Sequence, residues 1–169
     1  LFSVLLGTWA VYLTWALVRE LYPAAPWLAL AAAAIHAFTP MVVFIHASVN
    51  NDNLIVPLCS LALLYMVRLV KGATHFRKCV APHAPYLWLG LTIGLAMLTK
   101  ASGLALLPLA AATVAWQAKQ RLDATGDWGR ALLHALREMA LILLPALAVS
   151  GWWFYRNFQL YGDWLGLNA

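Results

Sequence analysis

Residues 86–116 read YLWLGLTIGLAMLTKASGLALLPLAAATVAW, a stretch of 31 residues in which Lys100 is the only charged side chain. As one helix at 1.5 Å per residue it would be about 46 Å long, whereas the hydrocarbon core of a bilayer is about 30 Å thick. Two shorter helices joined by a turn at Lys100 would each fit that core. The stretch therefore predicts a helical hairpin that crosses a membrane twice.

The composition of the whole chain also indicates a membrane protein. Of its 169 residues, 64% are hydrophobic and 10% are charged, against about 45–50% and about 25% in soluble domains. This balance excludes a disordered chain, a collagen and a soluble enzyme of ordinary build. The eleven Lys and Arg residues are too few and too scattered for a nucleic-acid-binding surface.

The remaining apolar stretches divide into further membrane segments. Thr39-Pro40 interrupts one of them, because proline lacks the N–H and clashes with the preceding helical turn. Residues 127–138 are charged and amphipathic, as in helices that lie on a membrane surface. We expect an all-α, polytopic transmembrane helix bundle that is a fragment of a larger bundle. Its six membrane segments are expected at about 1–18, 25–46, 52–70, 86–99, 102–117 and 139–155.

The basic residues decide the orientation of these segments. If 86–116 is a hairpin, one side of the membrane carries nine Lys and Arg residues and the other carries two, which is a strong positive-inside bias. A single long helix over 86–116 would move 119–138 to the other side and remove the bias. Residues 50–53, Lys100 and 156–169 are therefore expected outside. The nine inner residues are Arg19, Arg68, Lys71, Arg77, Lys78, Lys119, Arg121, Arg130 and Arg137.

The few charges expected on the outer side are Asp52, Lys100, Arg156 and Asp163. Charged groups at membrane depth are costly and point to a function. Arginine offers a planar fork to phosphate oxygens and lysine a mobile point charge, so Lys100 and Arg156 suit an anionic lipid head group. Structural roles compete with this interpretation. Lys100 and Arg156 would serve as snorkelling anchors, Asn51 or Asp52 as a helix cap, and Asp163 as a turn residue.

Other residues give weaker signals. His36 and His46 are ten residues apart, which is poor evidence for a metal site, and the chain has no nucleotide-binding loop, zinc signature or nucleophile elbow. Gly90 and Gly94 favour close packing of two helices. Five aromatic residues near the end of the chain predict an aromatic belt at the membrane interface, or a surface for a sugar or a lipid: Trp152, Trp153, Tyr155, Tyr161 and Trp164.

Four motifs follow one another along the chain: VRELYP at 18–23, Thr39-Pro40 leading to SVNNDNL at 48–54, GLAMLTKASGL at 94–104, and WWFYRNFQLYGDWLG at 152–166. With these motifs, in this order and spacing, the chain resembles the C-type membrane glycosyltransferases. The resemblance is to the branch that includes the protein O-mannosyltransferases, the aminoarabinose transferases of lipid A and related bacterial sugar transferases.

The resemblance implies an enzyme of the bacterial inner or plasma membrane that transfers a sugar from a polyprenyl-phosphate donor. The acceptor is a lipid, a glycan or a protein on the outer side. The family's catalytic base is an Asp in an outer loop upstream of residue 1, so the fragment is expected to be inactive alone. Asp52 is then the candidate catalytic residue, and Asn51, Lys100 and Arg156 are candidate substrate-binding residues.

In this interpretation Lys100 and Arg156 stabilise the departing lipid phosphate. Asp52 orients the acceptor, or helps to hold a divalent cation if the reaction uses one. No metal site and no other cofactor is predicted, and the expected partners are the lipid-linked donor, the acceptor and membrane lipids.

Two alternatives remain. A transporter or flippase for lipid-linked substrates would also place phosphate-binding cations near the membrane, and a non-catalytic membrane subunit would need none of this chemistry. The sequence has no convincing internal repeat, and its outer polar groups gather at one surface, which favours the transferase.

Overall fold

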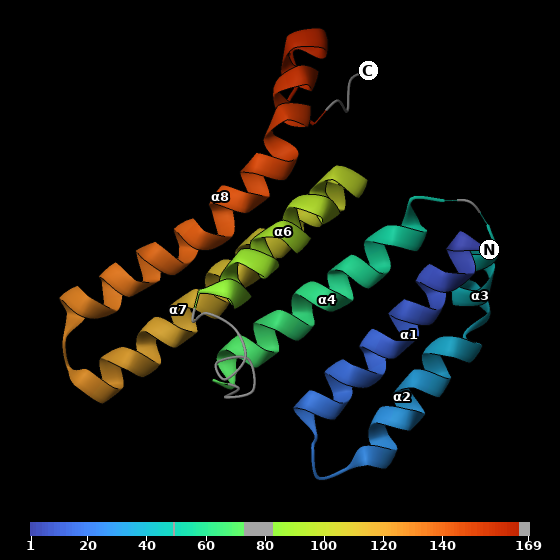
Figure 1. Ribbon diagram of the computed structural model, residues 1–169, viewed down its shortest axis with the longest axis horizontal. Helices are drawn as coiled ribbons and strands as arrows, with labels where there is room; N and C mark the ends of the chain where they lie inside the picture. The colour runs from blue at the N-terminus through green and yellow to red at the C-terminus, as the bar shows by residue number, and fades with distance from the viewer. Residues whose placement is uncertain (49, 73–82, 166–169) are drawn as a thin grey trace. The chain divides into compact units, whose positions relative to one another are not determined.

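The computed structural model describes residues 1–48, 50–72 and 83–165. Within these ranges every regular element is a helix, so the expected all-α fold is confirmed. The chain divides into two compact units, Leu1–Ala73 (unit 1) and Thr74–Ala169 (unit 2). Figure 1 shows the helices of both units, and each unit is described by itself.

Unit 1 consists of α1 (Phe2–Leu21), α2 (Pro26–Phe38), α3 (Pro40–Ala47) and α4 (Asp52–Val70). Helix α1 packs against both α2 and α4 (Figure 1). Proline opens both α2 and α3, because the first helical position needs no N–H donor. The axes of α2 and α3 are bent by 59° at Thr39, so the predicted interruption of the second membrane segment is confirmed.

Unit 2 consists of α6 (Ala84–Thr99), the short 3₁₀ helix η1 (Ala101–Ala105), α7 (Leu106–Thr125) and α8 (Trp128–Tyr161). Helices α6 and α8 pack closely at two glycines. A Cβ atom on Gly90 would lie 2.3 Å from the Ile142 carbonyl oxygen, and one on Gly94 would lie 2.9 Å from the Ala146 carbonyl oxygen. The predicted role of the two glycines in helix packing is therefore confirmed. Since both contacts advance in the same direction along the chain, α6 and α8 run parallel.

The chain reverses direction between α6 and α7, as the length of 86–116 predicts. Helix α6 ends at Thr99, and Lys100 adopts an extended conformation before η1. A Cβ atom on Gly103 would lie 2.6 Å from the Ala96 carbonyl carbon. The reversal therefore places the Gly103 backbone against the last turns of α6, where a larger residue would not fit.

Helix α8 differs from the expectation of a surface helix at 127–138 followed by a separate membrane segment. It is one helix of 34 residues, about 51 Å long at 1.5 Å per residue. The Asp127 carboxylate accepts a hydrogen bond from the Arg130 N–H at 3.0 Å and caps its start, and Gly162 ends it with a φ of 68°. One buried face follows the whole length of the helix, at Ala131, Glu138, Ile142, Ala146, Ser150 and Asn157.

The helices have the length and composition of membrane spans. In the part of the chain that the structure describes, α1, α4, Ala101–Thr125 and α8 are each long and apolar enough to cross a bilayer, and the bent pair α2–α3 would be a fifth span. Helix α6 is apolar but shorter, at 16 residues. Large apolar side chains such as Phe38, Phe44 and Leu144 are exposed on these helices. The chain is therefore an all-helical membrane protein.

Candidate substrate-binding site

In unit 1 the candidate residues lie where α3 gives way to α4. The buried side chain of Asn53, which is 2% exposed, donates a hydrogen bond from Nδ2 to the Ser48 carbonyl oxygen at 2.6 Å. This bond ties the first turn of α4 to the end of α3. Asn51 and Asp52 lie next to this contact, at the start of α4.

Asp52 is the first residue of α4, and its carboxylate interacts with the residues just before the helix. The Asp52 N–H donates to Asn50 Oδ1 at 3.2 Å, and Asn50 Nδ2 donates to Asp52 Oδ2 at 3.4 Å. Asn51 occupies the N-cap position without a side-chain capping hydrogen bond. The expectation that Asn51 caps the helix is therefore wrong, and Asn50 supplies the acceptor for the Asp52 N–H. The position of Asp52 at the start of α4 places its negative charge at the positive end of the helix dipole.

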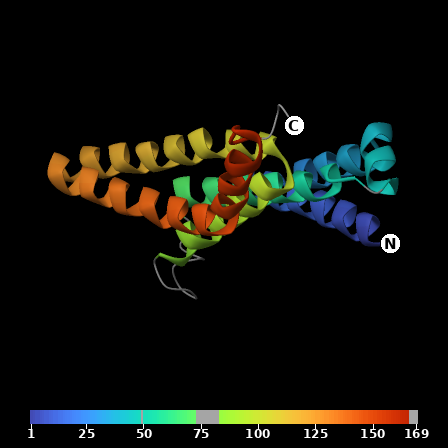
Figure 2. The same ribbon diagram turned by 90° about the horizontal axis from the view of Figure 1, so that it is seen from above.

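In unit 2 the two candidate basic residues both follow the close contact of α6 and α8. Gly94 lies against Ala146. Lys100 is six residues beyond Gly94, just after the end of α6, and Arg156 is ten residues beyond Ala146 in α8. Both are exposed. Beyond this contact the C-terminal part of α8, drawn in red, bends away from the direction of α6 (Figures 1 and 2).

The residues after α8 fold back onto the helix. Trp164 stacks on Phe158 with ring centroids 4.5 Å apart. Asp163 Oδ1 accepts a hydrogen bond from the Leu165 N–H at 3.1 Å, so the predicted turn role of Asp163 is confirmed. Beside Arg156, the side chain of Asn157 is buried, and its Nδ2 has no hydrogen-bond partner among the described residues.

The four candidate site residues belong to different units: Asn51 and Asp52 to unit 1, Lys100 and Arg156 to unit 2. A common site for all four remains a prediction.

His36 and His46 both make contacts with other residues of unit 1. Thr14 Oγ1 lies 2.6 Å from His36 Nδ1, and His46 is buried against Gly7. Across the described ranges, no group of three or more His, Cys, Asp or Glu residues could hold a metal ion.

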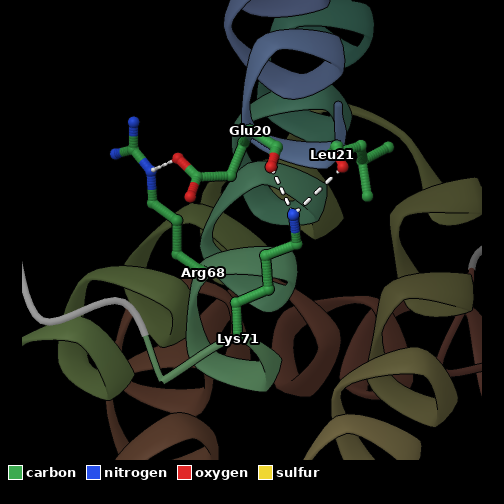
Figure 3. Close-up of polar contacts among 4 residues, drawn as sticks. All are labelled: Glu20, Leu21, Arg68 and Lys71. Atoms are coloured by element: carbon green, nitrogen blue, oxygen red, sulfur yellow. Dashed lines mark hydrogen bonds and ion pairs between the residues drawn. The ribbon is translucent and has the colours of Figure 1, made fainter. Parts of the chain in front are cut away.

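Sequence reasoning missed a set of polar contacts at the other ends of the helices. In unit 1, Arg68 Nε donates to Glu20 Oε2 at 3.1 Å, and Lys71 Nζ donates to the carbonyl oxygens of Glu20 and Leu21 (Figure 3). These bonds tie the C-terminal ends of α1 and α4 together. Arg68 and Lys71 therefore have structural partners, although sequence reasoning counted them only as charges that set orientation.

Unit 2 has a similar ion pair. Arg121 Nη2 donates to Glu138 Oε1 at 2.5 Å, and Tyr86 Oη donates to Gln117 Oε1 at 3.1 Å. Glu138 is buried. It lies 18 residues before Arg156 in the same helix.

Comparison with known proteins gives a family. The sequence model described as dolichyl-phosphate-mannose-protein mannosyltransferase matches residues 1–152. The matched range includes Asn51, Asp52 and Lys100 and ends before Arg156. No curated protein and no solved structure matches the chain.

Proposed function

The chain belongs to the dolichyl-phosphate-mannose-protein mannosyltransferase family, and from this premise we propose that it forms part of an integral-membrane glycosyltransferase with its site on the outer side of the membrane. The donor is a sugar carried on a polyprenyl phosphate, and the acceptor is a lipid, a glycan or a protein. The finding that carries the proposal is the family match over residues 1–152, and two basic residues of unit 2 suit it, Lys100 after α6 and Arg156 in α8. Both side chains are exposed.

The basic pair suits the leaving group of the reaction. As the acceptor oxygen or nitrogen bonds to the anomeric carbon, the bond between that carbon and the phosphate oxygen breaks. The electron pair of that bond leaves with the polyprenyl phosphate, which gains negative charge. Positive groups fixed near that oxygen stabilise the transition state more than the ground state. Arg156 supplies a two-pronged donor for phosphate oxygens and Lys100 a movable charge.

Asp52 suits the acceptor side of the reaction. Its carboxylate is at the N-terminal end of α4, held by Asn50, and a carboxylate can accept a hydrogen bond from an acceptor hydroxyl or amide. That bond would orient the acceptor while a general base removes the proton. Asn51, exposed at the neighbouring position, is placed to contact the same substrate. If the enzyme uses a divalent cation, Asp52 is the residue of this group that would bind it.

A second candidate function is a transporter or flippase for the same lipid-linked substrate. One observation favours it, because α2 and α3 form an apolar pair bent by 59°, and broken helices are common in transporters. The family favours the transferase.

One experiment separates the two functions. The full-length protein is reconstituted in vesicles with a polyprenyl-phosphate sugar and an acceptor, and the released polyprenyl phosphate and the glycosylated acceptor are both measured. Equal amounts of the two products support the transferase. Movement of intact donor between leaflets with no cleavage would contradict it.

A further inference from the structure

The hairpin of α7 and α8 continues well past the ion pair that joins the two helices. Beyond Arg121 and Glu138, α7 continues to Thr125 and α8 begins at Trp128. The part of α8 from Trp128 to Glu138 is about 15 Å long. Its start is fixed by the Asp127 cap and by Gly126, whose φ of 68° suits glycine. This end of unit 2 is therefore a helical hairpin with a capped turn.

One side of this helical end is apolar and exposed. Trp128 is 73% exposed and Leu133 is 68% exposed. Leu132 and Leu136 are exposed beside them, and the spacing of the four residues places them on one arc of the helix. We call these four residues the apolar arc. Contact of an apolar surface of this kind with water is unfavourable, so we expect it to contact lipid or another protein.

A second arc of the same helix is basic. Arg130, His134 and Arg137 follow one another at intervals of four and three residues, which places them on one side of the helix, and all three are exposed. The third side of the helix, with Ala131 and Glu138, is buried within unit 2. A basic arc beside an apolar arc at the end of a membrane-spanning helix suits the head groups of an anionic leaflet, which attract Lys and Arg next to a span.

The apolar arc is continuous with the exposed stripe of the rest of α8. At the helical period, Leu144 and Leu147 follow Leu132 and Leu136 on the same side, and both are exposed. From Trp128 to Leu147 the stripe is about 29 Å long. This is close to the thickness of a hydrocarbon core, about 30 Å. Lipid that covers the middle of the stripe would therefore also cover its first turns.

We propose that residues 128–137 form a binding surface for anionic phospholipid head groups. The apolar arc lies at the boundary between head groups and acyl chains, and Arg130 and His134 contact lipid phosphates. The positive charge of the surface favours anionic lipids. The Arg130 side chain is 83% exposed, and its surface ion pair with Asp127 can be exchanged for a contact with a lipid phosphate at little cost in free energy. This surface is at the opposite end of α8 from Arg156, so the proposal is independent of the proposed sugar transfer.

Spin labels test the position of the apolar arc. In the full-length protein with Cys59 and Cys79 replaced by serine, one label is attached at Leu133→Cys and, as a control, one at Asp123→Cys on the exposed flank of α7. In phosphatidylcholine vesicles containing phosphatidylglycerol, molecular oxygen should relax the Leu133 label more than a water-soluble nickel chelate does. The Asp123 label should show the reverse. A Leu133 label that favours nickel, or one shielded from both reagents as a protein partner would shield it, overturns the proposal.

The charge of the lipid is tested separately. Association of spin-labelled phosphatidylglycerol, relative to spin-labelled phosphatidylcholine, is measured for the wild-type protein and for Arg130→Gln and Arg130→Lys. Loss of one basic charge near an anionic surface should weaken the preference about fivefold, and the lysine variant should keep it. An equal preference in all three proteins would contradict the head-group role of Arg130.

Discussion

Arg68 Nε lies 3.1 Å from Glu20 Oε2. This ion pair joins the C-terminal ends of α1 and α4, although the two residues are 48 positions apart in the sequence. In unit 2 the corresponding pair is Arg121 and Glu138, 2.5 Å apart. The Glu138 side chain is 8% exposed, whereas that of Glu20 is 26% exposed. The two pairs should therefore contribute differently to stability, because solvent screens the first and much less the second.

This contrast gives a prediction for two double-mutant cycles. Replacing Glu20 and Arg68 by alanine, singly and together, should give a coupling free energy below about 1 kcal/mol. The Arg121–Glu138 cycle should give a larger value, and Arg121→Ala alone should cost up to about 3 kcal/mol because it leaves the buried Glu138 carboxylate unpaired. The measurement is the free energy of reversible unfolding in detergent for the wild type and for each single and double variant. Equal couplings at the two sites would show that burial does not distinguish them.

Helix packing in unit 2 gives the second prediction, with a matched control in the same unit. Gly90→Ala adds a Cβ atom that would lie 2.3 Å from the Ile142 backbone, and overpacking of this kind costs about 1–3 kcal/mol. Gly151→Ala adds the same atom in α8, where no described atom lies within 4 Å, so it should be neutral or slightly stabilising. The melting temperatures of the two variants in detergent compare them directly. A Gly90 variant as stable as the Gly151 variant would contradict the close approach of α6 and α8.

The proposed orientation gives the third prediction. Single cysteines at Asn51 and Leu160 should react with a membrane-impermeant reagent from outside intact cells, whereas one at Asp123 should react only after the membrane is opened. All three positions are exposed, and none has the positive φ that makes substitution at Gly126 or Gly162 strained. Labelling of Asp123 from outside would put the C-terminal end of α7 on the outer side of the membrane, and the positive-inside bias would then disappear.

Lys100 shows how much of this fold the sequence could predict. The turn there follows from a mismatch between the length of an apolar stretch and the thickness of a membrane, which needs no knowledge of packing. The reason that the turn closes, the fit of Gly103 against Ala96, depends on three-dimensional contacts. So do the pairs Glu20–Arg68 and Arg121–Glu138, because nothing in the sequence indicates which of several charges meet across 48 or 17 residues.

The boundary that the sequence predicts inside α8, near residue 139, is wrong for a physical reason. The polarity changes from charged residues at 127–138 to apolar residues at 139–155, but a helix ends at a breaker and not at a change in polarity. No proline or glycine lies between Arg130 and Pro145. The buried face from Ala131 to Asn157 keeps one helical period throughout, and this period was the signal for a single helix. For the candidate site, the sequence predicts which residues take part and on which side of the membrane they lie. It does not predict how they are arranged in space, because Asp52 and Lys100 belong to different units.

Asp52 gives the fourth prediction. Asp52→Asn keeps an oxygen that can accept the hydrogen bond from Asn50 and keeps the start of α4, but it removes the negative charge. If the carboxylate orients the acceptor, turnover of the full-length enzyme should fall while its melting temperature stays within a few degrees. Asp123→Asn, an exposed acidic residue near the end of α7, is the control and should have wild-type turnover. Normal turnover in Asp52→Asn would leave that residue only a structural role.

Arg156 gives the last prediction, and it tests a residue outside the range that matches the family. If the guanidinium binds the donor phosphate, Arg156→Ala loses a charge-assisted hydrogen bond worth about 1.5–3 kcal/mol, which corresponds to roughly 10- to 150-fold in kcat/KM for the donor. Arg156→Lys keeps the charge but loses the fork, so it should fall between Arg156→Ala and the wild type. A snorkelling anchor would behave differently, because lysine replaces arginine there with little loss. Arg19→Ala, an exposed arginine near the end of α1, is the control and should leave the donor KM unchanged. The measurement is donor-dependent turnover in nanodiscs at equal protein and melting temperature, and wild-type kinetics in both Arg156 variants would identify Arg156 as an anchor.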